Sequence, residues 1–143
     1  MKEIVLGIWL VILGYVDFRK KEIPLWFSIL GGMIGVVICI VEGRDFFDIL
    51  FACLPGTLAM IFSWMTRETI GYGDGIVLLI MGIYLPVSQL LSIGMLAFFI
   101  AGIIALLLLT VFHKKGTYRI PFIPFLSIAY GIEYMMRIGE RTI

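Results

Sequence analysis

The sequence predicts an all-α, polytopic integral membrane protein with about six transmembrane helices. Hydrophobic residues make up 62% of the 143 residues and charged residues only 15%, and the mean hydropathy is +1.11. A water-soluble globule of this composition would leave too much apolar surface exposed. The formal net charge of +1 lacks the basic excess typical of nucleic-acid binding. We therefore expect the lipid bilayer as a partner, no nucleic acid, and a single transmembrane domain over residues 1–143.

Apolar runs mark the first three helices. The first, Ile4 to Val16, ends in the charged stretch 17–22. It lacks the strongly basic start and the cleavage site of a signal peptide, so we expect it to be retained. The second helix runs from Leu25 to Val41 and follows Ile23-Pro24, because proline is tolerated where a helix begins. The third runs from Ile49 to Met65.

The fourth apolar run is short. It extends from about Gly73 to Tyr84 and stops before Pro86. At ~1.5 Å per residue, such a helix cannot cross the ~30 Å hydrocarbon core of a bilayer. Its N-terminal end should therefore lie below the membrane surface. A long fifth helix is predicted over Ser88 to Phe112, and a sixth opens at residues 120–125 and ends near Met136.

The distribution of Lys and Arg predicts the orientation in the membrane. If the helices alternate in direction, the loops after the first, third and fifth share one side and hold seven of the eleven basic residues. The positive-inside rule makes that side cytoplasmic and places both chain termini outside. The cytoplasmic set is Arg19, Lys20, Lys21, Arg67, Lys114, Lys115 and Arg119, and the outer set is Lys2, Arg44, Arg137 and Arg141.

Two aspartates fall at the same predicted cytoplasmic edge. Asp17 ends the first helix and Asp74 begins the fourth. Two carboxylates held close together cannot both ionise easily, so they share a proton and supply a base for water and an acid for a leaving amine. This chemistry is peptide hydrolysis, and it needs no metal or other cofactor. The alternative is that each acid caps a helix or neutralises neighbouring lysines.

Three glycines at alternate positions surround the second aspartate. Gly71 and Gly73 precede Asp74, and Gly75 follows it. Glycine adopts backbone angles closed to other residues and allows another backbone or a substrate to approach closely. This composition suits a loop that presents a carboxylate into a cleft.

Three motifs occur in a characteristic order: Asp17 followed by Ile23-Pro24, the Gly-x-Gly-Asp motif ending at Asp74, and residues 121–125 at the start of the last helix. In this respect the chain resembles the type IV prepilin peptidase family of membrane aspartyl proteases. The resemblance implies cleavage of the short basic leader of a prepilin or pilin-like protein at the cytoplasmic face of the cell's inner, or cytoplasmic, membrane. It also implies that Asp17 and Asp74 are the catalytic pair. The supporting motif residues would be Gly71, Gly73, Gly75, Ile23, Pro24, Pro121, Phe122 and Pro124.

The sequence departs from this family pattern at two positions. Many members carry a lysine two residues after the second aspartate, where this chain has Ile76, and a glycine between the two late prolines, where it has Ile123. The first difference leaves the pair of aspartates intact. Larger bacterial members add a cytoplasmic region with paired Cys-x-x-Cys motifs and N-methylate the new pilin terminus. We expect a short form without that region and without methylation.

Two other functions stay open. A different Gly-x-Gly-Asp intramembrane protease, of the presenilin and signal-peptide-peptidase type, would share the second motif, although this chain lacks a Pro-Ala-Leu run. A small transporter or an inactive membrane partner would use two buried acids to bind a proton or a cation. A neighbouring gene for a protein with a basic leader, a glycine and an apolar segment would favour the peptidase.

The remaining conspicuous side chains have ordinary structural interpretations. Trp9, Trp26 and Trp64 lie near predicted helix ends and are expected to be interfacial anchors. Cys39 and Cys53 lie within apolar segments, so we expect them to pack there rather than to form a disulfide or a zinc site.

Overall fold

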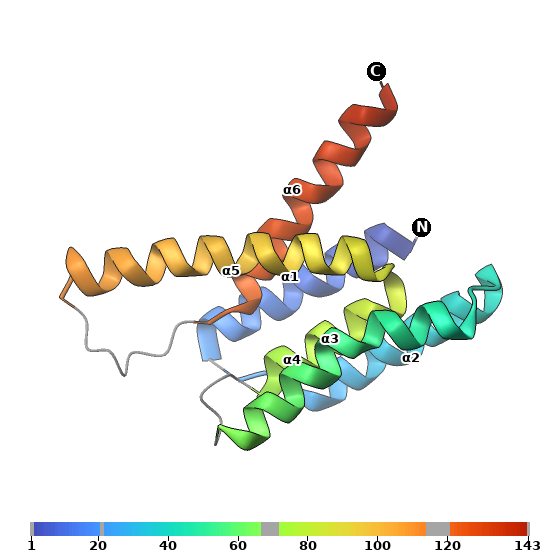
Figure 1. Ribbon diagram of the computed structural model, residues 1–143, viewed down its shortest axis with the longest axis horizontal. Coiled ribbons are helices and arrows are strands. Elements are labelled where there is room, and N and C mark those ends of the chain that lie inside the picture. Colours follow the sequence, from blue (N-terminus) through green and yellow to red (C-terminus); the bar gives the residue numbers. More distant parts are fainter. Residues whose placement is uncertain (1, 21, 67–71, 114–120, 143) are drawn as a thin grey trace.

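The protein is a bundle of six helices in its computed structural model (Figure 1). The structure describes residues 2–20, 22–66, 72–113 and 121–142, and within these ranges the chain forms helices joined by short connections, without β-strands. The helices are α1 (Lys2–Lys20), α2 (Leu25–Glu42), α3 (Phe46–Met65), α4 (Tyr72–Tyr84), α5 (Val87–Thr110) and α6 (Ile123–Thr142). The predicted all-α fold is therefore confirmed.

The helices differ in their capacity to cross a membrane. Among the described residues, α2, α3 and α5 are long and apolar enough to span a bilayer. Helix α4 is apolar but has only 13 residues, about 20 Å at the usual rise per residue. Helices α1 and α6 have 19 and 20 residues and carry charged side chains toward their ends. The fold is that of an all-α membrane protein, and the crossing of the membrane by all six helices stays a prediction.

Three helices extend beyond their predicted apolar runs, and one of them is α3, which begins at Phe46 rather than at Ile49. Helix α1 continues to Lys20, so Asp17 lies inside its last turn rather than at its end. Basic residues there interact favourably with the helix C-terminus. Helix α6 continues past Met136 to Thr142, and in this extension Arg137 donates to Glu3 Oε1 at 2.9 Å. Hydropathy identifies only the apolar part of a helix. A helix can continue beyond that part where its charged side chains form ion pairs.

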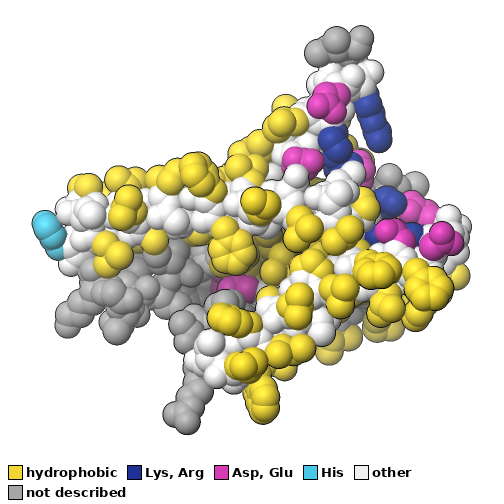
Figure 2. All heavy atoms as spheres, viewed as in Figure 1, with side chains coloured by type: hydrophobic (Ala, Val, Ile, Leu, Met, Phe, Trp, Pro, Cys, Tyr) yellow, Lys and Arg dark blue, Asp and Glu magenta, His cyan; other side chains and the backbone are white. Residues whose placement is uncertain are grey.

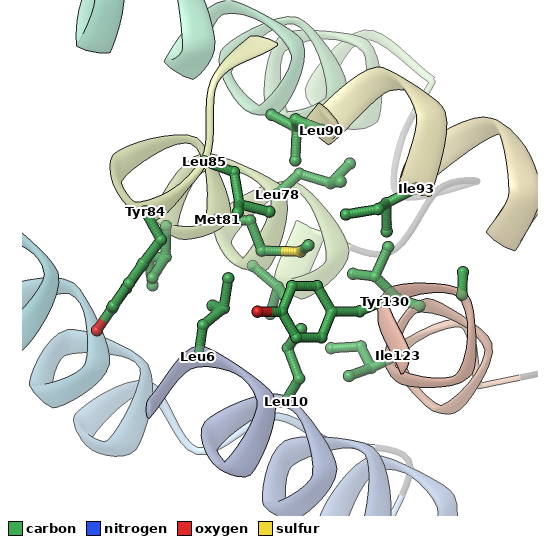
Figure 3. Packing of buried hydrophobic residues seen from close by; sticks show 14 of the residues in the cluster. Leu6, Leu10, Leu78, Met81, Tyr84, Leu85, Leu90, Ile93, Ile123 and Tyr130 are labelled. Atoms are coloured by element: carbon green, nitrogen blue, oxygen red, sulfur yellow. The ribbon is translucent and has the colours of Figure 1, made fainter. Parts of the chain in front are cut away.

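The core lies where α4 meets α1 and α6 (Figure 3). Leu6 and Leu10 of α1 point toward Met81 of α4, and Ile123 and Tyr130 approach from α6. These side chains are almost completely buried. By contrast, the outward faces of α2, α3 and α5 expose large apolar side chains, as Figure 2 shows for one side of the molecule. An apolar exterior around an apolar core is the arrangement that a bilayer requires.

Small residues bring α3 and α4 into close contact. A Cβ atom added to Gly56 of α3 would collide with the backbone of Leu79, and one added to Gly82 of α4 would collide with the carbonyl of Ala52. Transmembrane helices associate through such close backbone packing, because lipid provides no hydrophobic drive between helices. The short helix α4 is thereby held against a helix long enough to span.

Arg44, in the turn between α2 and α3, donates hydrogen bonds to the backbone carbonyls at the C-terminal end of α4. Its Nη1 donates to the carbonyls of Gly82 (3.2 Å) and Ile83 (2.6 Å), and its Nη2 donates to that of Leu85 (2.8 Å). Pro86 has no N–H with which to bond the Gly82 carbonyl four residues back. A helix that ends inside the bundle needs such donors, since unsatisfied carbonyls are costly there.

These contacts fix the relative direction of the helices. Lys2, at the N-terminus of α1, pairs with Glu42, at the C-terminus of α2, at 2.7 Å. The turn that follows Glu42 carries Arg44, which binds the C-terminus of α4. The start of α1 and the end of α4 therefore share one end of the bundle. The last turn of α1 and the first turn of α4 share the other, which we call the aspartate end.

One of the three tryptophan assignments is wrong. Trp9 is only 6% exposed, its Nε1 donates to the Phe27 carbonyl at 3.2 Å, and its indole occupies the space left by Gly31 of α2. It joins α1 to α2 and is no interfacial anchor. Trp26 and Trp64 are exposed, as anchors would be. Both cysteines are free thiols within apolar helices, and their Sγ atoms donate to carbonyls of α4.

Candidate active site

Asp17 is a buried acid in the last turn of α1. Only 6% of the residue is exposed, although the following Phe18, Arg19 and Lys20 are all exposed. Its Oδ2 accepts the backbone N–H of Ile123, the first residue of α6, at 3.3 Å. A carboxylate buried at the edge of a membrane bundle is costly unless it is hydrogen-bonded, and it marks a functional candidate.

Asp74 lies in the first turn of α4 and is partly buried. The backbone N–H groups of a first turn and the positive end of the helix dipole favour a carboxylate there. The next residue, Gly75, is buried, and a Cβ atom added to it would meet Met60 of α3. Glycine at this position therefore allows the turn that carries Asp74 to pack closely against α3.

The Ile23-Pro24 motif contacts the glycine-aspartate motif. A Cβ atom added to Gly73 would collide with Cδ1 of Ile23 and would lie 3.2 Å from its Cγ1. Pro24 is the N-cap residue of α2, and its carbonyl accepts the backbone N–H of Ser28 at 3.1 Å. The two motifs, far apart in the sequence, thus form one packed unit next to Asp74.

The late proline motif opens α6. Pro121 precedes the helix and Pro124 lies in its first turn. The ring of Phe122 contacts Phe98 of α5, with ring centroids 4.8 Å apart. Phe122 thus joins the start of α6 to α5 beside Asp17. Gly71 lies outside the described residues.

The structure brings both predicted aspartates to the aspartate end of the bundle. Figure 1 shows the last turn of α1, the first turn of α4 and the first turn of α6 at this end. Figure 2 shows an acidic side chain recessed between α5 and α3. Ile23 lies against Gly73 of α4 at the same end. Two carboxylates in such a position are suited to acid–base chemistry on a peptide that reaches the membrane edge.

Sequence reasoning missed two residues that shape this end of the bundle. Gly14 packs against Pro124 of α6, and Phe98 of α5 packs against Phe122. The sequence spacing could have identified Gly14, because it lies one helical turn before Asp17 on the same helix face. The described residues contain no group of three or more His, Cys, Asp or Glu side chains placed to hold a metal ion.

Fold and site together define a polytopic membrane protein with two acids at one end of its helix bundle. Residues 4–110 match the type IV leader peptidase family. The matched range covers well over half of the chain and includes Asp17 and Asp74. The chain therefore belongs to this family and is a type IV leader peptidase-like protease of the membrane. Residues 121–125 lie beyond the match. The chain matches no curated protein and no solved structure.

Proposed function

We propose that this protein is an aspartyl endopeptidase that removes the basic leader of a prepilin or pilin-like protein. Membership of the type IV leader peptidase family supports a peptidase of this kind. The observation that carries the specific assignment is the placement of the motif acids Asp17 and Asp74, with 56 residues between them in the sequence, at the same end of the bundle. The whole described chain then serves as one catalytic domain.

The proposed reaction uses one water molecule between the two aspartates. One carboxylate takes a proton from the water molecule while the water oxygen attacks the carbonyl carbon of the scissile peptide. The other acid, protonated at the start, donates its proton to the nitrogen of the leaving amine as the C–N bond breaks. After the bond breaks the pair is still singly protonated, but the proton now lies on the acid that took it from water. Transfer of this proton back to the other carboxylate restores the starting state. This cycle requires both acids, because each has a separate role.

The exposed charged residues at the aspartate end support its placement at the cytoplasmic face of the membrane. Arg19 and Lys20 are exposed there, next to the buried Asp17, and the positive-inside rule assigns such residues to the cytoplasm. Glu22 is also exposed at this end and would attract the basic leader of a substrate. The apolar segment of the substrate would remain in the bilayer beside the lipid-facing helices.

A cleavage assay in detergent tests this proposal. The purified protein should cut a substrate with a basic leader, a glycine and an apolar segment, and mass spectrometry of the product should place the new N-terminus after the leader. Asp17→Asn and Asp74→Asn should each abolish cleavage while leaving the protein folded. A matched control is Asp45→Asn, because Asp45 is an exposed residue at the opposite end and makes no capping hydrogen bond through its side chain.

Two results would overturn the assignment. One is an intact leader after incubation with wild-type protein under conditions in which the protein is folded. The other is activity above about a tenth of wild type in either Asn variant, which corresponds to a barrier change of less than about 1.4 kcal/mol. Such a small loss is compatible with a lost contact but not with a lost acid–base cycle.

A further inference from the structure

We propose that the first turn of α6 positions Asp17 for catalysis through the backbone N–H of Ile123, and that Gly14 makes this contact possible. The proposal rests on the proposed function. It assigns a positioning role to a main-chain group, so the identity of the side chain at position 123 matters less than the path of the backbone. It also gives a physical role to the late proline motif.

The contact joins the two ends of the chain. The N–H of Ile123 donates to Asp17 Oδ2 at 3.3 Å, and the two residues are 106 positions apart in the sequence. Both are buried, Ile123 completely and Asp17 to all but 6%. Hydrogen bonds around catalytic groups are often long before substrate binds, and they shorten in the reactive complex. A buried, main-chain donor has little freedom to rotate away from the carboxylate.

The sequence leaves this N–H available. The first N–H groups of a helix have no partner within the helix. In α6, Pro124 has no N–H, and the N–H of Leu126 already bonds to the Phe122 carbonyl at 3.1 Å. Ile123 therefore directs a first-turn donor, together with the positive end of the α6 dipole, at Asp17. This opposes the effect of α1, whose negative C-terminal end carries the same acid.

Gly14 allows α6 to come close enough. It is buried on α1 one turn before Asp17, on the same face. A Cβ atom added there would lie 3.3 Å from Cα of Pro124 and 3.3 Å from Oγ of Ser127. The first of these is a backbone atom next to Ile123, so it cannot move without displacing the donor. A larger residue at position 14 would push the start of α6 away from Asp17.

Removal of the N–H is the first test. Ile123→Pro deletes the donor, and its backbone is compatible with the first position of a helix. Because proline also changes the buried side chain, Ile123→Ala is the comparison, since it loses packing but keeps the N–H. Infrared difference spectra against Asp17→Asn identify the Asp17 carboxyl band. We expect this band to shift in Ile123→Pro but not in Ile123→Ala.

The kinetic readout separates positioning from binding. Relative to Ile123→Ala, Ile123→Pro should lower kcat by about tenfold or more, the loss expected for one hydrogen bond to a charged group, with KM unchanged. An Asp17 band at the same frequency in both variants would overturn the proposal. So would equal kcat values in the two variants.

A matched pair of glycine variants tests the packing. Gly14→Ala and Gly7→Ala each add one methyl group to the contact between α1 and α6, with a closest approach of 3.3 Å in both cases. At Gly7 the neighbour is the side chain of Tyr130, remote from Asp17. Gly14→Ala should shift the Asp17 band and lower kcat, whereas Gly7→Ala should leave the band in place. Equal effects of the two variants on the band would contradict the proposal.

The spectroscopic readout does not depend on cleavage. If wild-type protein cut no pilin-like substrate, the proposed function would fail, but the Asp17 band would still report whether Ile123 donates to it. If cleavage occurred and the band were insensitive to Ile123→Pro, only the positioning role would fail. The two failures are therefore distinguishable.

Discussion

Replacement of Arg44 should destabilise the protein much more than loss of its ion pair. In Arg44→Met the carbonyls of Gly82 and Leu85 lose the guanidinium donors that reach them at 3.2 and 2.8 Å. The Ile83 carbonyl keeps the Cys39 thiol, at 2.8 Å. Methionine retains much of the apolar stem of arginine, so most of the effect comes from the lost hydrogen bonds.

The magnitude follows from the number of acceptors left without a donor. A buried acceptor without its partner costs about 1–3 kcal/mol, so two of them predict a loss of about 2–6 kcal/mol in the free energy of unfolding. Arg44 also pairs with Asp48 at 2.6 Å, but the Asp48 side chain is 46% exposed. Exposed pairs of this spacing contribute about 0.3–0.5 kcal/mol. Asp48→Asn should therefore have an effect several times smaller than Arg44→Met.

The assay is equilibrium unfolding in detergent micelles titrated with a denaturing detergent. Fluorescence of the buried Trp9 reports on the packing of α1 against α2. Arg44→Met should shift the transition strongly and Asp48→Asn only slightly. Equal shifts for the two variants would show that Arg44 acts through its ion pair, and would refute its role as the C-terminal cap of α4.

Two further predictions concern glycines. Gly56→Ala should destabilise the protein by about 1–3 kcal/mol, because its methyl group meets the backbone of Leu79, whereas Gly94→Ala enters open space and should change stability by less than about 1 kcal/mol. The same unfolding titration measures both, and equal effects would contradict the close crossing of α3 and α4. Gly73→Ala should reduce cleavage, and Ile23→Ala combined with it should restore part of the lost rate, because the added methyl group meets the end of the Ile23 side chain. An activity in the double variant no higher than in Gly73→Ala would rule out this contact as the cause.

Much of the fold could be predicted from the sequence, because apolar runs define membrane helices directly. The start of α2 after Pro24 and the short α4 before Pro86 agree with the structure. The errors lie where polar residues continue a helix, as in the last turn of α1 and in residues 137–142 of α6. Hydropathy does not record such turns, since their stability comes from charge partners such as Glu3 for Arg137.

The two acids of the candidate site could be predicted from the sequence, but the contacts that hold them in place could not. Asp17 and Asp74 were identified because charge is rare at the edges of apolar runs, and helix alternation placed them on one side. The donation from Ile123 to Asp17 spans 106 residues and arises only from the packing of α6 on α1. The prediction for Trp9 was wrong for a related reason. Its position near a predicted helix end indicated an anchor at the membrane interface, but the small Gly31 of α2 leaves room for its ring inside the bundle.

The central claim is that Asp17 and Asp74 act as one catalytic unit on a single water. It is tested most directly by cleavage rates of Asp17→Asn, Asp74→Asn and the double variant with the same pilin-like substrate. Residues that act as a unit are strongly non-additive, so we predict that the double variant is no slower than either single variant. Losses that multiply in the double variant would mean that the two aspartates contribute independently, and would contradict the shared mechanism.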